Sequence, residues 1–271
     1  MHDIKLIMLD MDGTLFTDDK RITEKTMCCL KQLKSLGIFI GIATGRPTFN
    51  VKRTIQTYKL DEIVDFVVGL NGVEVANLNR DTIDYQDQMT CDMAIEIAHK
   101  IKDTDMNMIT YTPECAYARF DEPRVHRLCK NLQLPLKLYD YSEDTRTWNK
   151  VLVMRNEPYT KEECDFLLSI NNNRYHGFIT DVDCFEIVNA NVSKASGIKA
   201  ICKELGITMD EVMAFGDSGN DIDMLKAVGY GVVMANGSSE AKAVAKYETL
   251  SNEEDGIAYF IEKYIGGTLW N

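Results

Sequence analysis

The chain has 271 residues, of which 45% are hydrophobic, and its formal net charge at pH 7 is −12. This length corresponds to about two domains. The acidic balance argues against a broad nucleic-acid-binding surface, because such surfaces need clustered positive charge. A small anion remains an acceptable partner, since local charges in a cleft can oppose the net charge of the protein.

The eight cysteines show neither a CxxC motif nor the Cys/His spacing of a zinc site. We therefore expect reduced thiols in a cytoplasmic protein. The first predicted strand starts at Lys5, which leaves no room for a signal peptide. No apolar run reaches the roughly 18 residues that a membrane helix needs. The sequence thus predicts a protein that binds no membrane and forms a monomer or a weak homo-oligomer.

The first third of the chain alternates between predicted strands and helices. Thr23 is placed to cap the first helix, and Pro47 suits the first turn of the second. Alternation of this kind is typical of a parallel sheet. The predicted strands are Lys5–Asp10, Ile38–Ala43 and Phe66–Val68, and the predicted helices are Thr23–Leu36 and Pro47–Tyr58.

The middle of the chain has a different pattern of predicted elements, with hairpin-like and extended stretches between the helices. From Ser193 the alternating pattern resumes. We therefore predict an α/β fold: a Rossmann-like parallel-sheet core, residues 1–84 and 187–271, with an inserted α+β cap domain, residues 85–186. The later predicted core elements are the helices Ser193–Leu205, Asp221–Ala227, Ser239–Ala245 and Gly256–Tyr264 and the strands Val212–Phe215 and Gly231–Met234.

Polar residues follow the predicted core strands. Ligands of open parallel sheets lie beyond the carboxyl ends of the strands, so these residues are expected to converge. Lys194, in the first turn of a predicted helix, opposes the helix dipole unless an anion lies nearby. The residues in question are Asp10 and Asp12 after the first strand, Thr44 and Gly45 after the second, and Asp217, Asn220 and Asp221 after a late strand.

Such a set fits a magnesium ion and a phosphate group. Converging carboxylates repel one another, and Mg²⁺ prefers hard oxygen ligands. Thr44 and Gly45 precede a helix whose free N–H groups attract anions. Asp10 could attack phosphorus and form an aspartyl-phosphate, while Asp12 gives a proton to the leaving oxygen and then activates water. Gly13 would let the backbone turn away sharply.

Each feature also has an ordinary structural explanation. An aspartate pair can form a turn, Thr-Gly can start a helix, and Lys194 can be a solvated lysine. GDSGND (Gly216–Asp221) could cap a helix or bind Ca²⁺, but it lacks the spacing of a calcium-binding loop. The joint occurrence of these features at one sheet edge favours phosphoryl transfer.

Taken together, four motifs resemble those of the haloacid dehalogenase-like (HAD) superfamily. They are DMDGTL, IATGRP, NVSKASGI and FGDSGNDIDML, in that order. The arrangement is similar to the Cof-type branch (type IIB), which carries an α/β cap between the second and third motifs. Met234–Gly237 reads as that family's Met-Gly-Asn-Ala with its small residues exchanged, and we expect this loop to touch none of the site residues.

The resemblance implies a Mg²⁺-dependent phosphatase for small phosphomonoesters such as sugar phosphates. Asp10 would be the nucleophile and a metal ligand, and Asp12 the acid/base with its backbone carbonyl on the metal. Asp217 would be a further metal ligand, and Asp221 would act outside direct metal contact. The phosphoryl group would be held by the Met11 amide, Thr44, Gly45, Lys194 and Asn220.

Two other functions stay open. A phosphomutase needs a second phosphate clamp in the cap, for which Arg119, Arg124, Arg127 and Lys130 are candidates. A non-catalytic sugar-phosphate sensor would not need Asp12. For a phosphatase, the candidate residues for substrate selection are Tyr111, Tyr117, Arg119 and Asp183.

Overall fold

The computed structural model describes residues 4–264 and consists of two compact units. Among these residues, the core contains 4–86 and 193–264, and the cap contains 87–192. We expected the boundaries at 84/85 and 186/187. The second of these falls inside strand β11 (Cys184–Asn189), which pairs with cap strands along its length. The whole of β11 therefore belongs to the cap.

The core is built on an eight-stranded sheet within the described residues, in the order β14-β13-β12-β1-β2-β3-β4-β5. Strands β4 and β5 run antiparallel to their neighbours, and the other pairings are parallel. The strands are β1 (Leu6–Leu9), β2 (Phe39–Ala43), β3 (Phe66–Gly69), β4 (Glu74–Asn77), β5 (Thr82–Tyr85), β12 (Val212–Gly216), β13 (Tyr230–Val233) and β14 (Tyr247–Glu248).

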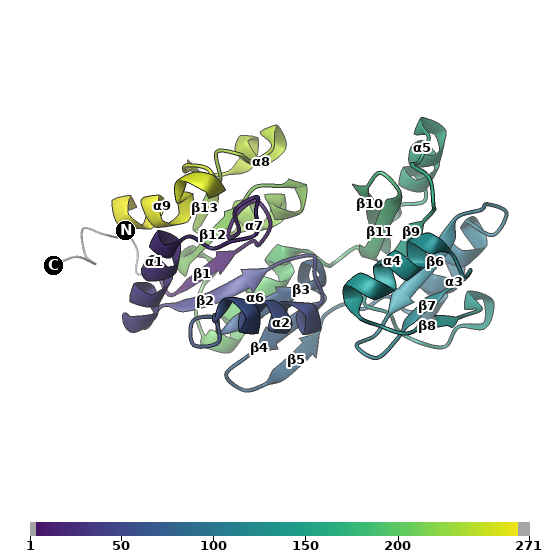
Figure 1. The fold of residues 1–271 in the computed structure, drawn as a ribbon, viewed down its shortest axis with the longest axis horizontal. Helices are drawn as coiled ribbons and strands as arrows, with labels where there is room; N and C mark the ends of the chain where they lie inside the picture. Colours follow the sequence, from purple (N-terminus) through teal and green to yellow (C-terminus); the bar gives the residue numbers. More distant parts are fainter. Residues whose placement is uncertain (1–3, 265–271) are drawn as a thin grey trace. The chain divides into compact units, whose positions relative to one another are not determined.

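Helices cover both faces of this sheet (Figure 1). Alternate residues of β1 point to opposite faces, because side chains along a strand alternate. Ile7 packs with α1, α2 and α9 on one face, and Leu6 packs with α6 and α7 on the other. The core helices are α1 (Glu24–Ser35), α2 (Thr48–Tyr58), α6 (Lys194–Leu205), α7 (Ile222–Ala227), α8 (Ser239–Val244) and α9 (Gly256–Tyr264).

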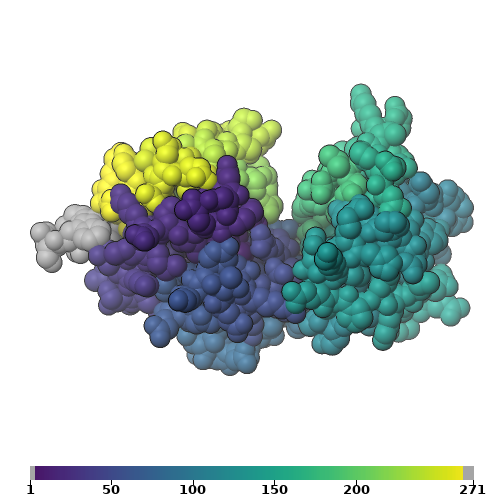
Figure 2. Space-filling model, in the orientation of Figure 1, coloured from purple at the N-terminus to yellow at the C-terminus, as the bar shows by residue number. Residues whose placement is uncertain are grey.

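The two ends of the chain build this unit together. In Figure 2 the purple N-terminal and yellow C-terminal residues lie side by side, and α1 contacts α9. Strand β1 lies between β12 and β2, so the strand order reverses at β1. Ligands of open α/β sheets bind at such a reversal, beyond the carboxyl ends of the strands. The predicted α/β core with an inserted domain is confirmed.

The cap has a six-stranded sheet in the described residues, in the order β10-β11-β9-β6-β7-β8. Helices α3 and α5 pack on one face through Met93, Ile97 and Leu167, around the buried Trp148. The sequence prediction missed the short edge strand β8. The elements are α3 (Cys91–Lys100), β6 (Asn107–Tyr111), β7 (Ala116–Ala118), α4 (Pro123–Leu132), β8 (Leu136–Leu138), β9 (Val151–Met154), α5 (Lys161–Ser169) and β10 (Tyr175–Asp181), followed by β11.

Helix starts follow the expected local chemistry with one exception. The Thr23 side chain accepts a hydrogen bond from the Thr26 N–H, as predicted for an N-cap. Pro47 is itself the N-cap of α2 and not part of its first turn. Within residues 4–264, no helix combines the length and apolar character needed to cross a bilayer.

Candidate active site

The ends of three neighbouring strands bring the predicted site residues to one edge of the core sheet. Leu9 of β1 is in register with Ile42 of β2 and with Phe215 of β12. Asp10 follows Leu9 directly, and Thr44 and Asp217 each lie two residues beyond the partner of Leu9. The register of the parallel strands is thus enough to place these residues side by side.

Lys194 is the central cation of this edge. Its side chain is 0% exposed, and its Nζ donates to Asp10 Oδ1 at 2.5 Å and to Asp221 Oδ1 at 2.6 Å. The alternative of a solvated lysine is therefore wrong. Burial alone would lower the pKa of Lys194, but attraction to the two carboxylates outweighs it and raises the pKa. The lysine stays charged, and its carboxylate partners offset its unfavourable place in the first turn of α6.

Asp221 connects this lysine to the loop that follows β12. Its Oδ2 accepts hydrogen bonds from the backbone N–H groups of Asp217 and Ser218, both at 3.0 Å. Asp221 is fully buried and uses both oxygens inside the protein. It therefore fixes the loop that carries Asp217.

Asp10, Asp217 and Asp221 form an acidic cluster that could hold a metal ion. One carboxylate oxygen from each lies within 4.8 Å of the others. Burial raises the pKa of Asp10 to about 7, with Lys194 opposing the rise and Asp221 adding to it. Burial and repulsion from Asp221 raise the pKa of Asp217 to about 6. Three carboxylates facing one ammonium leave the cluster short of positive charge, and its oxygen donors suit a hard divalent cation.

Gly13 makes the close approach of two loops possible. Its φ of +82° lies in the left-handed region, and a Cβ at this position would lie 2.6 Å from Asp217 Oδ2. A side chain would push Asp217 out of the cluster. Thr14 completes the link by donating from Oγ1 to Asp217 Oδ1 at 3.0 Å.

Asp12 lies outside the acidic cluster. Its carboxylate accepts two hydrogen bonds of 2.7 Å from Arg46 Nη2 and one of 2.8 Å from Lys20 Nζ. Partial burial would raise the pKa of Asp12, but the hydrogen bonds from Lys20 and Arg46 lower it below its usual value. The second predicted acid is therefore held ionised and paired. The sequence reasoning gave neither Arg46 nor Lys20 a role, although Arg46 belongs to the IATGRP motif.

One of the N–H groups at the start of α2 is not free, in contrast to the expectation from the sequence. Thr44 and Gly45 do precede this helix, but the Thr48 N–H donates to Glu74 Oε2 at 2.6 Å. The side chain of Glu74 is buried, so the N–H of the first residue of α2 already has a carboxylate partner and is not free for another anion. No sequence signal near Thr48 indicated this partner, because Glu74 arrives from the antiparallel strand β4.

Three further contacts to the site were missed. Asn220, a predicted phosphate contact, donates from Nδ2 to Asn71 Oδ1 at 3.2 Å. Asn236 donates to the Gly13 carbonyl at 2.8 Å, and the Ser238 N–H donates to the Asp217 carbonyl at 2.8 Å. Asn236 of the Met234–Gly237 loop thus contacts Gly13 beside the site, and the contact to Asp217 comes from Ser238, the residue after that loop. Met11 is buried, and its carbonyl accepts from the Phe16 N–H.

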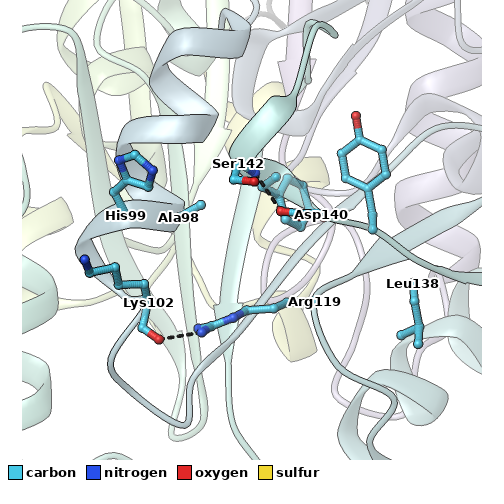
Figure 3. Close-up of a pocket in the computed structure, with 9 residues that line it drawn as sticks. Ala98, His99, Lys102, Arg119, Leu138, Asp140 and Ser142 are labelled. Carbon is cyan, nitrogen blue, oxygen red and sulfur yellow. Dashed lines mark hydrogen bonds between the residues drawn. The ribbon is translucent and has the colours of Figure 1, made fainter.

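The cap residues proposed for substrate selection are engaged within the cap. Arg119 donates to the carbonyl oxygens of Ile101 and Lys102 at the end of α3 and borders a cavity of about 590 Å³ (Figure 3). Asp183 accepts two hydrogen bonds from Arg124, at 2.5 and 2.8 Å. These contacts give both side chains a structural role inside the cap.

The two tyrosines proposed for substrate selection also lie among cap side chains. Tyr117 packs against Trp148 and lies beneath the Arg146 guanidinium. Tyr111 is buried, and its ring lies 5.7 Å from Lys150 Nζ.

Comparison with known proteins agrees with this geometry. A model of the haloacid dehalogenase-like hydrolase family matches residues 7–261. A Streptococcus pyogenes protein assigned as a phosphatase is 30% identical over 273 residues, which cover 97% of this chain and 98% of the relative. The 5-amino-6-(5-phospho-D-ribitylamino)uracil phosphatase YitU of Bacillus subtilis is 27% identical over 264 residues, covering 96% and 97%.

The fold also matches solved structures. A sugar phosphatase of HAD subclass IIB superposes with a TM-score of 0.80 at 24% identity, covering 97% of this chain and 99% of the other. At this identity the likeness concerns the fold. It extends over the core and the cap alike.

Proposed function

Because the chain belongs to the haloacid dehalogenase-like hydrolases, in the Cof-type branch, and is a phosphoric monoester hydrolase, we propose that it is a Mg²⁺-dependent phosphatase of small phosphorylated metabolites such as sugar phosphates. The observation that carries the proposal is the buried contact of Lys194 with Asp10 beside the carboxylate of Asp217. This arrangement combines a nucleophile, a cation for the phosphoryl group and a place for a metal.

Asp10 is the proposed nucleophile. Lys194 binds Asp10 Oδ1, and Asp10 Oδ2 has no hydrogen-bond partner among residues 4–264. That second oxygen can attack phosphorus while the ester P–O bond breaks, which forms an aspartyl-phosphate. The ammonium of Lys194 is positioned to stabilise negative charge on the transferring group. The Met11 amide, Thr44, Gly45 and Asn220 are the proposed further contacts of that group.

Asp12 is the proposed acid/base. The alkoxide that leaves in the first step takes a proton from Asp12, and the water that attacks in the second step gives one back. Arg46 and Lys20 hold Asp12 ionised in the structure, which suits the second step. The first step requires Asp12 to carry a proton, so both ion pairs must loosen when the substrate binds.

Mg²⁺ would be held by the Asp10 and Asp217 carboxylates, with the Asp12 backbone carbonyl as the third proposed protein ligand. Bound there, it would neutralise charge on the phosphoryl oxygens. Asp221 contributes by orienting the loop of Asp217 and not as a ligand, since both of its oxygens are already bound within the protein.

We propose a small phosphorylated metabolite as the partner, and we propose no nucleic-acid partner. The YitU relative, whose name specifies a phosphorylated ribityl compound, supports that substrate class. All eight cysteines are free thiols, which supports a reducing cytoplasmic location. We propose a monomer or weak homo-oligomer, which light scattering would measure.

Phosphate release from a panel of sugar phosphates, pyridoxal phosphate, flavin mononucleotide and nucleotides tests the proposal. We expect release with Mg²⁺, none with a chelator, and none from Asp10→Asn or Asp12→Asn. Asp19→Asn is the matched control, because Asp19 is an exposed carboxylate outside the site. Unimpaired release by Asp10→Asn would contradict the mechanism.

The phosphomutase alternative has less support. Two of its four candidate cap cations, Arg119 and Arg124, are already bound to cap carbonyls and to Asp183. Dependence of activity on a bisphosphate activator would favour the mutase. Phosphate binding without turnover would favour the sensor.

A further inference from the structure

Three consecutive residues with positive φ follow strand β3, next to the site. The φ angles are 49° at Leu70, 57° at Asn71 and 119° at Gly72. Such an angle is strained for leucine, whereas asparagine and glycine adopt it more readily, so at Leu70 it persists only because the surrounding structure imposes it. The surroundings of this segment are three parts of the chain that carry proposed phosphate-binding residues.

The backbone of this segment holds the loop after β2. The Asn71 N–H donates to the Thr44 carbonyl at 3.0 Å, and the Leu70 N–H donates to the Arg46 carbonyl at 3.0 Å. Both ends of the Thr44–Arg46 loop are thereby fixed. The position of Gly45 between them follows from these two bonds.

The side chain of Asn71 reaches the loop after β12. Its Oδ1 accepts from Asn220 Nδ2 at 3.2 Å, and Asn220 Oδ1 accepts from Ser218 Oγ at 2.7 Å. The amide plane of Asn220 is thus held at both ends. Its nitrogen carries two hydrogens, and since Asn71 takes one, the other points in a defined direction.

Asn71 also lies against Gly45. A Cβ built on Gly45 would be 3.3 Å from Asn71 Nδ2, so the amide packs on the face of this glycine. Asn71 is only 6% exposed. It therefore fills the space between Gly45 and Asn220, two residues proposed to bind the phosphoryl group.

The segment packs equally closely on the start of α6. A Cβ on Gly72 would lie 2.1 Å from the Ser193 carbonyl oxygen, a distance that no side chain allows. Ser193 is the N-cap of α6, and Lys194 is the first residue of that helix. The Leu70–Gly72 segment therefore also packs against the start of α6, which carries Lys194. This is the third part of the chain with a proposed phosphate-binding residue.

We propose that Asn71 is a positioning residue of the active site: it orients the Asn220 amide toward the phosphoryl group and, through its backbone, fixes the Thr44–Arg46 loop. The inference rests on the proposed phosphatase function. Asn71 acts through Asn220 and need not touch the substrate.

Asn71→Gly is the test variant, because glycine accepts the left-handed backbone and removes only the amide. We expect kcat to fall about 10- to 100-fold with a smaller change in KM, since a misplaced contact weakens the transition state most. Lys59→Gly is the matched control, because Lys59 has a φ of 55° at the end of α2 and takes no part in the site. It should keep wild-type kinetics. Wild-type kinetics of Asn71→Gly would overturn the inference.

A double-mutant cycle with Asn220→Ala separates positioning from a general structural effect. If Asn71 acts through Asn220, the double variant is no slower than Asn220→Ala alone. Additive losses would show that the two residues act independently and would overturn the inference.

A spectroscopic measurement tests the same point without turnover. The ¹H–¹⁵N side-chain amide signal of Asn220 should shift or broaden in Asn71→Gly and stay unchanged in Lys59→Gly. An unchanged signal in Asn71→Gly would overturn the inference. A wild-type protein that releases no phosphate from any compound would instead reject the proposed function, so the two failures are distinguishable.

Discussion

Lys194 in the core and Lys150 in the cap are both buried, but their surroundings carry different charge. Lys150 donates to the Glu186 carboxylate at 2.6 Å and also lies beside the Tyr111 side chain. Lys194 donates to Asp10 and Asp221 and has Asp217 nearby. The cap pair balances one positive with one negative charge, whereas the core cluster has more carboxylates than ammonium groups.

This difference separates a structural ion pair from a cluster that could hold a metal ion. For both lysines burial alone would lower the pKa, and attraction to carboxylates outweighs it and raises the pKa. In the core, however, Asp10 and Asp217 keep raised pKa values of about 7 and 6. One lysine does not offset three carboxylates, so a proton or a further cation is favoured in the core cluster and not at the cap pair.

The largest expected effect is on stability. Breaking a buried pair leaves an uncompensated charge and costs about 3–5 kcal/mol, whereas replacing both partners by apolar groups can be neutral. Lys150→Met should therefore lower the urea midpoint strongly, and Lys150→Met with Glu186→Leu should recover most of it. Circular dichroism measures both transitions.

The corresponding double replacement in the core should not restore the urea midpoint. Lys194→Met with Asp221→Leu leaves Asp10 buried and removes the acceptor of the Asp217 and Ser218 N–H groups. If both double variants recovered the urea midpoint equally, the proposed difference between the core cluster and the cap ion pair would be wrong.

The next effect is on catalysis. Lys194→Met should reduce the rate of phosphate release about 10²- to 10³-fold, as loss of a charge-stabilising donor does in other enzymes. Lys150→Met removes the same charge from the cap and should reduce the rate much less. Initial rates at saturating substrate provide the measurement, and comparable losses in the two variants would count against a special role for the core lysine.

Addition of Mg²⁺ should stabilise the folded protein, and we expect this effect to be smaller than those of the lysine replacements. At about a hundredfold excess over Kd, a bound ligand stabilises the folded protein by about 2.7 kcal/mol. The melting temperature should rise with Mg²⁺ in the wild type and in Glu186→Gln, and much less in Asp217→Asn. A rise of equal size in Asp217→Asn would place the metal elsewhere.

The smallest effect should come from Lys20→Ala. The Lys20–Asp12 pair has side chains 58% and 42% exposed, and exposed pairs contribute less than about 1 kcal/mol. Thermal unfolding should hardly change, and Asp19→Asn serves as a matched surface variant. A large destabilisation would show that the pair behaves as a buried one.

The alternation of strands and helices was sufficient to predict the five central strands of the core sheet, β1, β2, β3, β12 and β13, but not the edge strand β14. Strand β1 is apolar along its length because helices cover both of its faces, and parallel order then places Asp10, Thr44 and Asp217 at one edge. The place of Lys194 followed from its position in a helix that returns to this edge. These are consequences of periodicity and parallel pairing, which the sequence displays.

Side-chain partners from distant segments were not predictable in the same way. Glu74 reaches the start of α2 from an antiparallel strand, and Asn71 reaches Asn220 across the edge of the sheet. The positive φ of Leu70 has no sequence signal, because leucine rarely adopts it. In the cap, Arg119 follows strand β7 and Asp183 lies in the turn between β10 and β11, so alternation along a strand does not determine where either side chain points.

The discontinuous core also sets an order of assembly during protein synthesis. Strand β1 needs β12 as a neighbour, and the ribosome makes β12 only after the entire cap. At about 5–20 residues per second, a segment of roughly a hundred residues takes on the order of 5–20 s. The N-terminal strands wait during that time while the continuous cap can fold. Protease treatment of stalled nascent chains should find the cap resistant first, and a core protected before β12 emerges would contradict this order.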